Sequence, residues 1–313
     1  MRALTTAAAV LALAALPWLT HSNYVIGIAI STLIFTVAAS ALNLIYGFAG
    51  LLSFAQLGFW GIGGYATALT VTALGGSFWQ GLALAALINA AVAVAIGYPA
   101  LRTGRHAFVI VTLAFALLVT LIARDWVSLT RGPLGIPGLP APQLADFAFD
   151  TPARFYGIAL AYALAALAFL YALVSSRIGR TLLAIKQNEP LASAQGIAPM
   201  PYQLAAFTVA AALTGVAGGI YTFYLKIIDP TFLDFYYMQT FLIMVIVGGA
   251  GSFWGVVIAG FAMAALPEVL RFSQDFRMII YGAVLLIAML AIPGGVAGLI
   301  RERAVARMRT ALR

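Results

Sequence analysis

The acidic side chains of this 313-residue sequence are candidates for ion chemistry, because carboxylates can hold protons and cations. All nine lie in or beside polar stretches, and none lies in the middle of an apolar run: Asp125, Asp146, Asp150, Glu189, Asp229, Asp234, Glu268, Asp275 and Glu302. Transporters driven by protons usually keep an intramembrane carboxylate that loads and releases the ion. The pattern therefore argues against proton-driven transport, while sodium coupling through backbone carbonyls stays open.

The other chemically versatile residues indicate no catalytic site. His21 and His106 are isolated and predict no metal cluster. Lys186 and Lys226 are the only lysines, and neither follows the glycines of a phosphate-binding loop. No Ser-His-Asp arrangement suggests itself, and the chain has no Cys. We therefore expect no enzyme, no ATP site and no cofactor in this chain. If it moves a solute uphill, the energy enters through a partner.

Composition predicts the elements that must position these residues. With 64% hydrophobic and 8% charged residues, the chain has too little polar surface for a soluble core. We expect an all-α polytopic membrane protein, one transmembrane domain over residues 1–313. A span needs about 20 apolar residues, and about ten are predicted: Ala3–Leu19, Tyr24–Ile45, Phe54–Leu74, Trp79–Ala100, Ala107–Ala123, Phe155–Val174, Tyr202–Tyr224, Tyr236–Val247, Phe253–Leu270 and Arg277–Ile292. We expect the first segment, Ala3–Leu19, to be an uncleaved span rather than a signal peptide, because it lacks a clear A-x-A cleavage site.

Charge predicts the orientation. One side carries the loops 102–106 and 175–201 and the tail 294–313, with ten bases against two carboxylates. The other side carries mixed loops: 124–154, 226–234 and 268–277. Basic loops stay cytoplasmic, so both termini are expected there and the Gly/Pro-rich loop 124–154 is expected outside. The net charge of +8 suits anionic lipid rather than nucleic acid.

The segment 175–201 has helical order of its own. Ile178, Leu182 and Ile185 share one face at i, i+4 and i+7. Asn188 and Pro190 then interrupt the helix before a second turn, which is expected to end at Gly196. Two short helices with an apolar face suit docking of a soluble partner, and they equally suit a position on the lipid interface.

Two glycine-rich stretches resemble each other and predict the transport path. Each reads G-x-A-G, then Ser, then F-W-G and an aliphatic residue, from Gly47 and from Gly248. Paired glycine breaks in the two halves of a transporter point to its binding site, although chance likeness and true repetition both stay open. Path candidates are the break residues and nearby polar groups: Asn43, Gly47, Gly50, Ser53, Gln56, Gly248, Gly249 and Gly251.

Small residues also recur every four positions. Ala211, Gly215 and Gly219 form one such series, and Gly251, Gly255 and Ala259 form another. Such faces let helices approach closely. Packing within the chain is the favoured interpretation over a subunit interface.

These stretches together carry a family resemblance. NLIYGFAGLLSFAQLGFWGIGGYATAL at Asn43–Leu69 resembles the second-to-third-span region of LivM-type permeases of branched-chain amino-acid ABC transporters. RIGRTLLAIKQNEPLASAQGI at Arg177–Ile197 resembles their cytoplasmic coupling loop, with Glu189, Ala192 and Gly196 at the E-x-x-A-x-x-x-G spacing. GGAGSFWGVVIAG at Gly248–Gly260 and the Gly/Pro-rich loop around Arg131–Pro140 are similar to two further blocks. The chain departs from the family where Val256 and Val257 replace the common Gly and Pro.

The resemblance implies one subunit of an ABC importer for branched-chain or related amino acids in the bacterial inner membrane. Its implied partners are a LivH-type paralogous permease, two LivG/LivF-type ATPases that bind ATP and Mg²⁺, and a periplasmic substrate-binding protein. The loop 175–201 would dock on an ATPase through Arg177, Arg180, Lys186, Glu189, Ala192 and Gly196. A stand-alone channel or facilitator for a small polar solute is the alternative.

Overall fold

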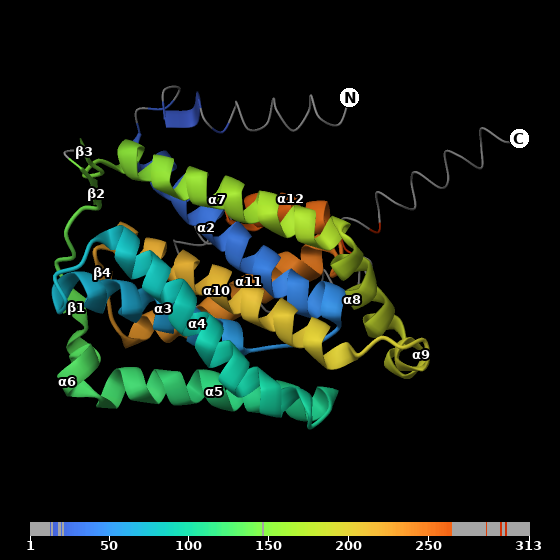
Figure 1. Cartoon of the computed structure of the whole chain (residues 1–313). Coiled ribbons are helices and arrows are strands. Elements are labelled where there is room, and N and C mark those ends of the chain that lie inside the picture. Colours follow the sequence, from blue (N-terminus) through green and yellow to red (C-terminus); the bar gives the residue numbers. More distant parts are fainter. Residues whose placement is uncertain are drawn as a thin grey trace, which may run out of the picture.

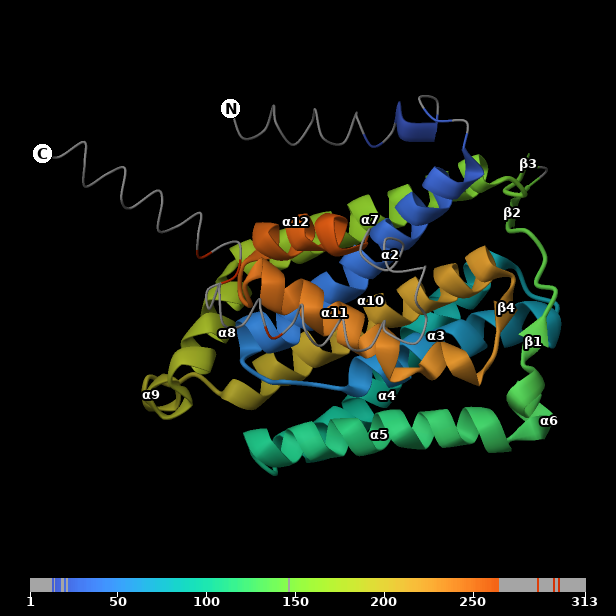
Figure 2. The same ribbon diagram turned by 180° about the vertical axis from the view of Figure 1, so that it is seen from behind.

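The computed structural model describes residues 13, 15–17, 20, 22–145, 147–264, 286, 295 and 298. They form a bundle of roughly aligned helices (Figures 1 and 2). The long helices are α2 (Asn23–Asn43), α3 (Ala55–Thr72), α4 (Phe78–Leu101), α5 (Arg105–Asp125), α7 (Pro152–Ser175), α10 (Pro199–Leu225), α11 (Phe235–Gly248) and α12 (Phe253–Ala264). The prediction of a mostly helical membrane protein is confirmed.

Short elements connect these helices. The π-helix η1 (Leu44–Ala49) continues α2, and α8 (Arg177–Gln187) and α9 (Glu189–Ala194) join α7 to α10. The remaining short pieces are α6 (Val127–Thr130), η2 (Gly132–Leu134), β1 (Ile136–Pro137), β2 (Gln143–Leu144), β3 (Phe147–Ala148), β4 (Ile227–Ile228) and η3 (Pro230–Leu233). The strands pair antiparallel, β1 with β4 and β2 with β3, so the expected all-α fold carries two small sheets.

The centre of the bundle is α2. It packs against α7, α10, α11 and α12, and most of its residues are buried. A helix that is apolar all round belongs in such a position. By contrast, α4, α5 and α7 leave most of their residues unburied. Their remaining surface is apolar and suits lipid.

The tightest packing joins α3 to α10 through glycines. A Cβ on Gly63 would collide with the backbone carbonyl of Gly215, and a Cβ on Gly218 would collide with the carbonyl of Trp60. A Cβ on Gly219 would collide with the side-chain hydroxyl of Thr67. The series through Gly215 and Gly219 therefore packs helices within the chain, as the favoured interpretation expected.

The predicted number of spans is not confirmed. Six described segments are long and apolar enough to cross a membrane: Asn23–Ala49, Phe78–Leu101, Arg105–Asp125, Pro152–Ser175, Pro199–Leu225 and Pro230–Gly248. The predicted spans Ala3–Leu19 and Arg277–Ile292 and the tail 294–313 lie almost wholly outside the described residues. The helix α11 has 14 residues, about 21 Å at 1.5 Å per residue. Alone it is shorter than a hydrocarbon core of about 30 Å.

The loops that the structure describes divide between the two ends of the bundle as the charge pattern predicted, while the loop 268–277 and the tail lie outside the described residues. Arg105, in the loop 102–106, pairs with Glu189 in the segment 175–201, and we call this end the α8 end. At the opposite end, Ile136 pairs with Ile228, which joins the loops 124–154 and 226–234. The Gly/Pro-rich stretch forms no long helix, as expected.

We expect Gly63→Ala to destabilise the bundle, because the added methyl group must push α3 away from the Gly215 carbonyl. Overpacking of this kind typically costs about 1–3 kcal/mol. Thermal unfolding of the purified protein in detergent measures the loss. Gly157→Ala in α7 is the matched control, because a Cβ there meets nothing within 4 Å. Equal melting of both variants would contradict the close approach.

Candidate functional site

The segment between α7 and α10 folds as two short helices, as its breakers predicted. The Ser176 hydroxyl caps α8 by accepting from the Ile178 N–H at 3.1 Å. The Asn188 side chain caps α9 by accepting from the Leu191 N–H at 3.0 Å, with Pro190 in the first turn. Gly196 follows α9 with φ of +83°, a left-handed conformation that glycine adopts without strain.

The apolar face of α8 is covered by the chain itself. Leu182 and Ile185 are fully buried, and Leu182 belongs to a cluster with Leu44, Phe48, Ala49, Leu170 and Ala206. Ile178 is on the same face by helix geometry, but it lies in the first turn of α8 and is 42% exposed. The buried positions of α8 are Gly179, Leu182 and Ile185.

The surface that α8 and α9 leave open carries both basic and apolar side chains. Arg177 and Arg180 are exposed, and Leu191 on α9 is 56% exposed. Gly196 is also exposed, and a Cβ there would meet nothing within 4 Å. Ala192, in contrast, is 4% exposed, so its small size serves packing within the chain.

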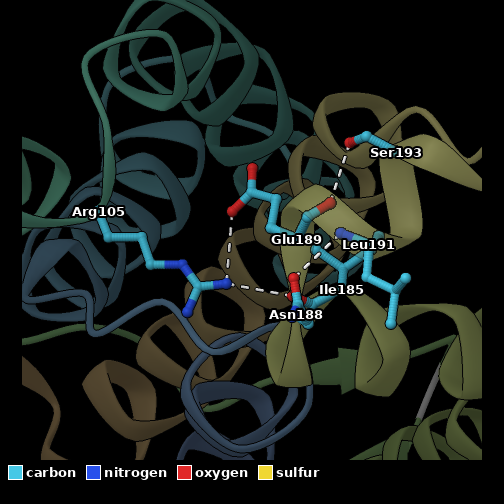
Figure 3. Close-up of polar contacts among 6 residues, drawn as sticks. All are labelled: Arg105, Ile185, Asn188, Glu189, Leu191 and Ser193. Carbon is cyan, nitrogen blue, oxygen red and sulfur yellow. Dashed lines mark hydrogen bonds and ion pairs between the residues drawn. The ribbon is translucent and has the colours of Figure 1, made fainter.

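Arg105 fixes the joint between α8 and α9 (Figure 3). Its Nη2 lies 3.3 Å from Glu189 Oε2 and donates to the Ile185 carbonyl at 3.1 Å. The two charged side chains are 41% and 38% exposed, and such pairs contribute only about 0–1 kcal/mol. The contact therefore orients Glu189 more than it stabilises the fold. Sequence reasoning missed this role, since 84 residues separate the partners.

The two glycine breaks meet at the α8 end. The Asn43 side chain accepts from the Gly251 N–H at 2.9 Å and donates to the Ser252 carbonyl at 3.2 Å. A Cβ on Gly47 would collide with both Asn43 Oδ1 and Gly251 N. We call Asn43, Gly47, Gly50, Gly251 and Ser252 the glycine junction. The helix formed by α2 and η1 ends at Ala49, four residues past the predicted end at Ile45, because η1 carries it past Gly47.

Lys186 joins the glycine junction from α8. Its Nζ donates to the Gly47 carbonyl at 2.6 Å. A Cβ on Gly50 would lie 2.8 Å from Lys186 Cγ, and Gly50 has φ of +75°. Burial lowers the pKa of the Lys186 ammonium group. One predicted coupling residue, Lys186, is thus brought together with the predicted path residues Gly47, Gly50 and Gly251, although they were assigned from separate stretches.

The other path candidates lie apart from these polar contacts. Ser53 is fully buried and its hydroxyl accepts from the Ala55 N–H at 3.2 Å, at the start of α3. Gln56 is fully buried, and its amide has no hydrogen-bond partner within the described part of the chain. Gly248 packs on the backbone of Gly255 and Val256, while Gly249 turns the chain with φ of +93°.

The carboxylates at the opposite end have structural positions. Asp229 caps η3 by accepting from the Thr231 N–H at 2.7 Å, and Asp234 caps α11 by accepting from the Tyr236 N–H at 2.9 Å. Asp150 forms an exposed ion pair with Arg154 at 2.9 Å. Each of these three carboxylates therefore has a structural contact, and none of them is assigned a chemical role.

The described helices define a multi-pass membrane protein. Residues 24–289 match the family model described as branched-chain amino acid transport system, permease component. The chain therefore belongs to this permease family.

Relatives agree with the family match. The chain is 29% identical over 301 residues to the high-affinity branched-chain amino acid transport system permease protein LivM of Salmonella typhimurium, covering 89% of this chain and 71% of the relative. LivM of Escherichia coli K12 is 29% identical over 305 residues, covering 90% and 72%. LivH of the same strain is 25% identical over 282 residues, covering 84% and 91%. No solved structure matched significantly. The predicted LivM-type permease is confirmed.

We expect Asn43→Leu to destabilise the permease, because it leaves the half-buried Gly251 N–H without its partner and takes from the Ser252 carbonyl one of its two donors, the other being the Val256 N–H. A buried donor left unsatisfied costs about 1–3 kcal/mol. Thermal unfolding in detergent measures the loss, with faster hydrogen exchange at Gly251. Asn89→Leu is the control, because the fully buried Asn89 donates only to Ala85 in its own helix. An Asn43→Leu protein that melts with wild type would refute the bridging role.

Proposed function

We propose that this chain forms, together with a LivH-type permease, the path of branched-chain or related amino acids across a bacterial inner membrane. Two LivG/LivF-type ATPases, which bind ATP and Mg²⁺, power the transport, and a periplasmic binding protein delivers the substrate. The family membership supports the transport role, and the relatives named LivM and LivH support a paired permease.

The observation that carries the coupling role is the preformed α8–α9 element. It projects from one end of the bundle with Arg177, Arg180 and Leu191 exposed, while its other face is packed on η1 and α10. A partner that moves the exposed face would therefore also move the helices of the bundle, because their side chains already contact α8 and α9. The α8 end is cytoplasmic in this proposal, because it carries the basic loops.

The glycine junction is the place where such a load would act on the path. Gly50 and Gly251 have φ of +75° and +95°, so both helices are interrupted by glycine backbone. Changes of φ and ψ at such residues can alter the direction of the adjoining helix. Closure of the ATPases would shift the population between outward-open and inward-open forms by binding one form better. The loop 124–154 at the opposite end is the surface proposed for the binding protein.

A stand-alone channel would conduct without partners, and reconstitution separates the two functions. Proteoliposomes that hold this chain and its LivH-type partner should take up labelled leucine against a gradient only with ATPases, ATP, Mg²⁺ and loaded binding protein. Vesicles without ATPases give the control rate. Equal rates of leucine equilibration with and without the ATPases would favour the channel.

Gly196→Asp should abolish ATP-driven uptake and co-purification of the ATPases. The substitution leaves the chain itself intact, because the Cβ site is open and Asp is among the few residues that enter the left-handed region. A new carboxylate then disturbs only a surface that a partner covers.

Gly75→Asp is the matched control for that variant. Gly75 has φ of +64° and an equally open Cβ site, but it lies between α3 and α4 at the end opposite α8. It should keep both uptake and the ATPases. Normal uptake and normal ATPase recovery by Gly196→Asp would remove α9 from the docking surface.

A further inference from the structure

Lys186 differs from the other bases of α8 in the direction of its side chain. Arg177 and Arg180 are exposed, but Lys186 is half-buried and its ammonium group contacts the Gly47 carbonyl at 2.6 Å. The partners are 139 residues apart in sequence. A base placed for a soluble partner would point outward, so this geometry calls for another role.

The carbonyl that Lys186 contacts is at a special position. Gly47 lies in the last turn of the continuous segment Asn23–Ala49, where helix carbonyls lack partners within the helix. The aligned peptide dipoles place partial negative charge there, so a cation is favoured. Lys186 thus caps, from outside, the helix that forms the centre of the bundle.

The surroundings leave the lysine little freedom. Its stem fills the space beside Gly50, where even a Cβ would lie 2.8 Å from Lys186 Cγ. A Cβ on Gly251 would lie 3.6 Å from the ammonium nitrogen. Gly47 packs directly on the Asn43 side chain and on the backbone of Gly251, and Asn43 bonds to Gly251 and Ser252. A displacement of Gly47 therefore acts on both breaks.

We propose that Lys186 is a positioning residue that ties α8 to the glycine junction, so that movement of α8 re-aims both broken helices. This inference rests on the proposed importer function and adds a residue-level route for coupling. It assigns docking to the exposed surface of α8 and α9 and transmission to Lys186.

The test compares variants in the complete transporter, with permease pair, ATPases and binding protein in proteoliposomes. Lys186→Met keeps the apolar stem and removes the charged donor, whereas Lys186→Arg keeps a charged donor. Three quantities are measured: ATPase co-purification, ATP hydrolysis, and leucine transported per ATP hydrolysed. Lys226→Met, which alters the only other lysine and lies at the opposite end, is the control.

We expect Lys186→Met to retain the ATPases and hydrolysis but to lower leucine transported per ATP by roughly tenfold or more, the size of a lost charged hydrogen bond. Lys186→Arg should recover most of that ratio, and Lys226→Met should match wild type. A wild-type ratio in Lys186→Met overturns the proposal, and so does loss of its ATPases, which would assign Lys186 to docking. If the wild-type complex shows no ATP-driven uptake, the importer function itself fails.

Chemical rescue keeps the test decisive if Lys186→Met folds poorly. The chain has no native cysteine, so Lys186→Cys introduces a single thiol into it. Alkylation with 2-bromoethylamine forms a carbon–sulfur bond, releases bromide, and rebuilds an ammonium group at nearly the original reach. The number of leucine molecules transported per ATP hydrolysed should be low in Lys186→Cys before alkylation and restored after it, with the alkylated wild-type complex as the control. A ratio that stays low after complete alkylation, or is normal before it, overturns the proposal.

Discussion

Backbone groups freed by a broken helix must find partners inside the protein, because lipid offers none. The glycine junction meets this requirement with two side chains. Asn43 serves the amide of Gly251 and the carbonyl of Ser252, and Lys186 serves the carbonyl of Gly47. The junction can therefore keep two irregular backbones adjacent at the end of an apolar bundle. The positions of α8, α11 and α12 all depend on that arrangement.

The rest of the bundle separates a rigid interior from a lipid-facing exterior. Glycines let α3 and α10 approach until their backbones touch, and α2 is enclosed by its neighbours. The helices α4, α5 and α7 keep most of their apolar surface outward. Arg105 on α5 pairs with Glu189 on α9, so the segment formed by α8 and α9 contacts an exterior helix as well as the interior of the bundle.

Local signals predicted local structure well. Asn188, Pro190 and Gly196 marked the helix boundaries correctly, because caps and breakers act within a few residues. The long-range contacts of Lys186 and Arg105 could not be predicted, since nothing near either residue encodes a partner 80 or more residues away. The division of the late apolar stretch into Tyr236–Val247 and Phe253–Leu270 was predicted correctly, because the glycines between them act locally and α12 begins at Phe253. The number of spans stays a prediction, since hydropathy cannot show whether a helix of 14 residues such as α11 crosses by itself.

The covered apolar face of α8 has a consequence for the chain by itself. Leu182 and Ile185 are buried within this chain alone, and Leu182 packs against side chains of η1, α7 and α10. Large bare apolar patches invite aggregation, and α8 exposes Arg177 and Arg180 beside the single large apolar side chain of Ile178. Once the chain has folded, Leu182 and Ile185 therefore need no second protein to keep them from water.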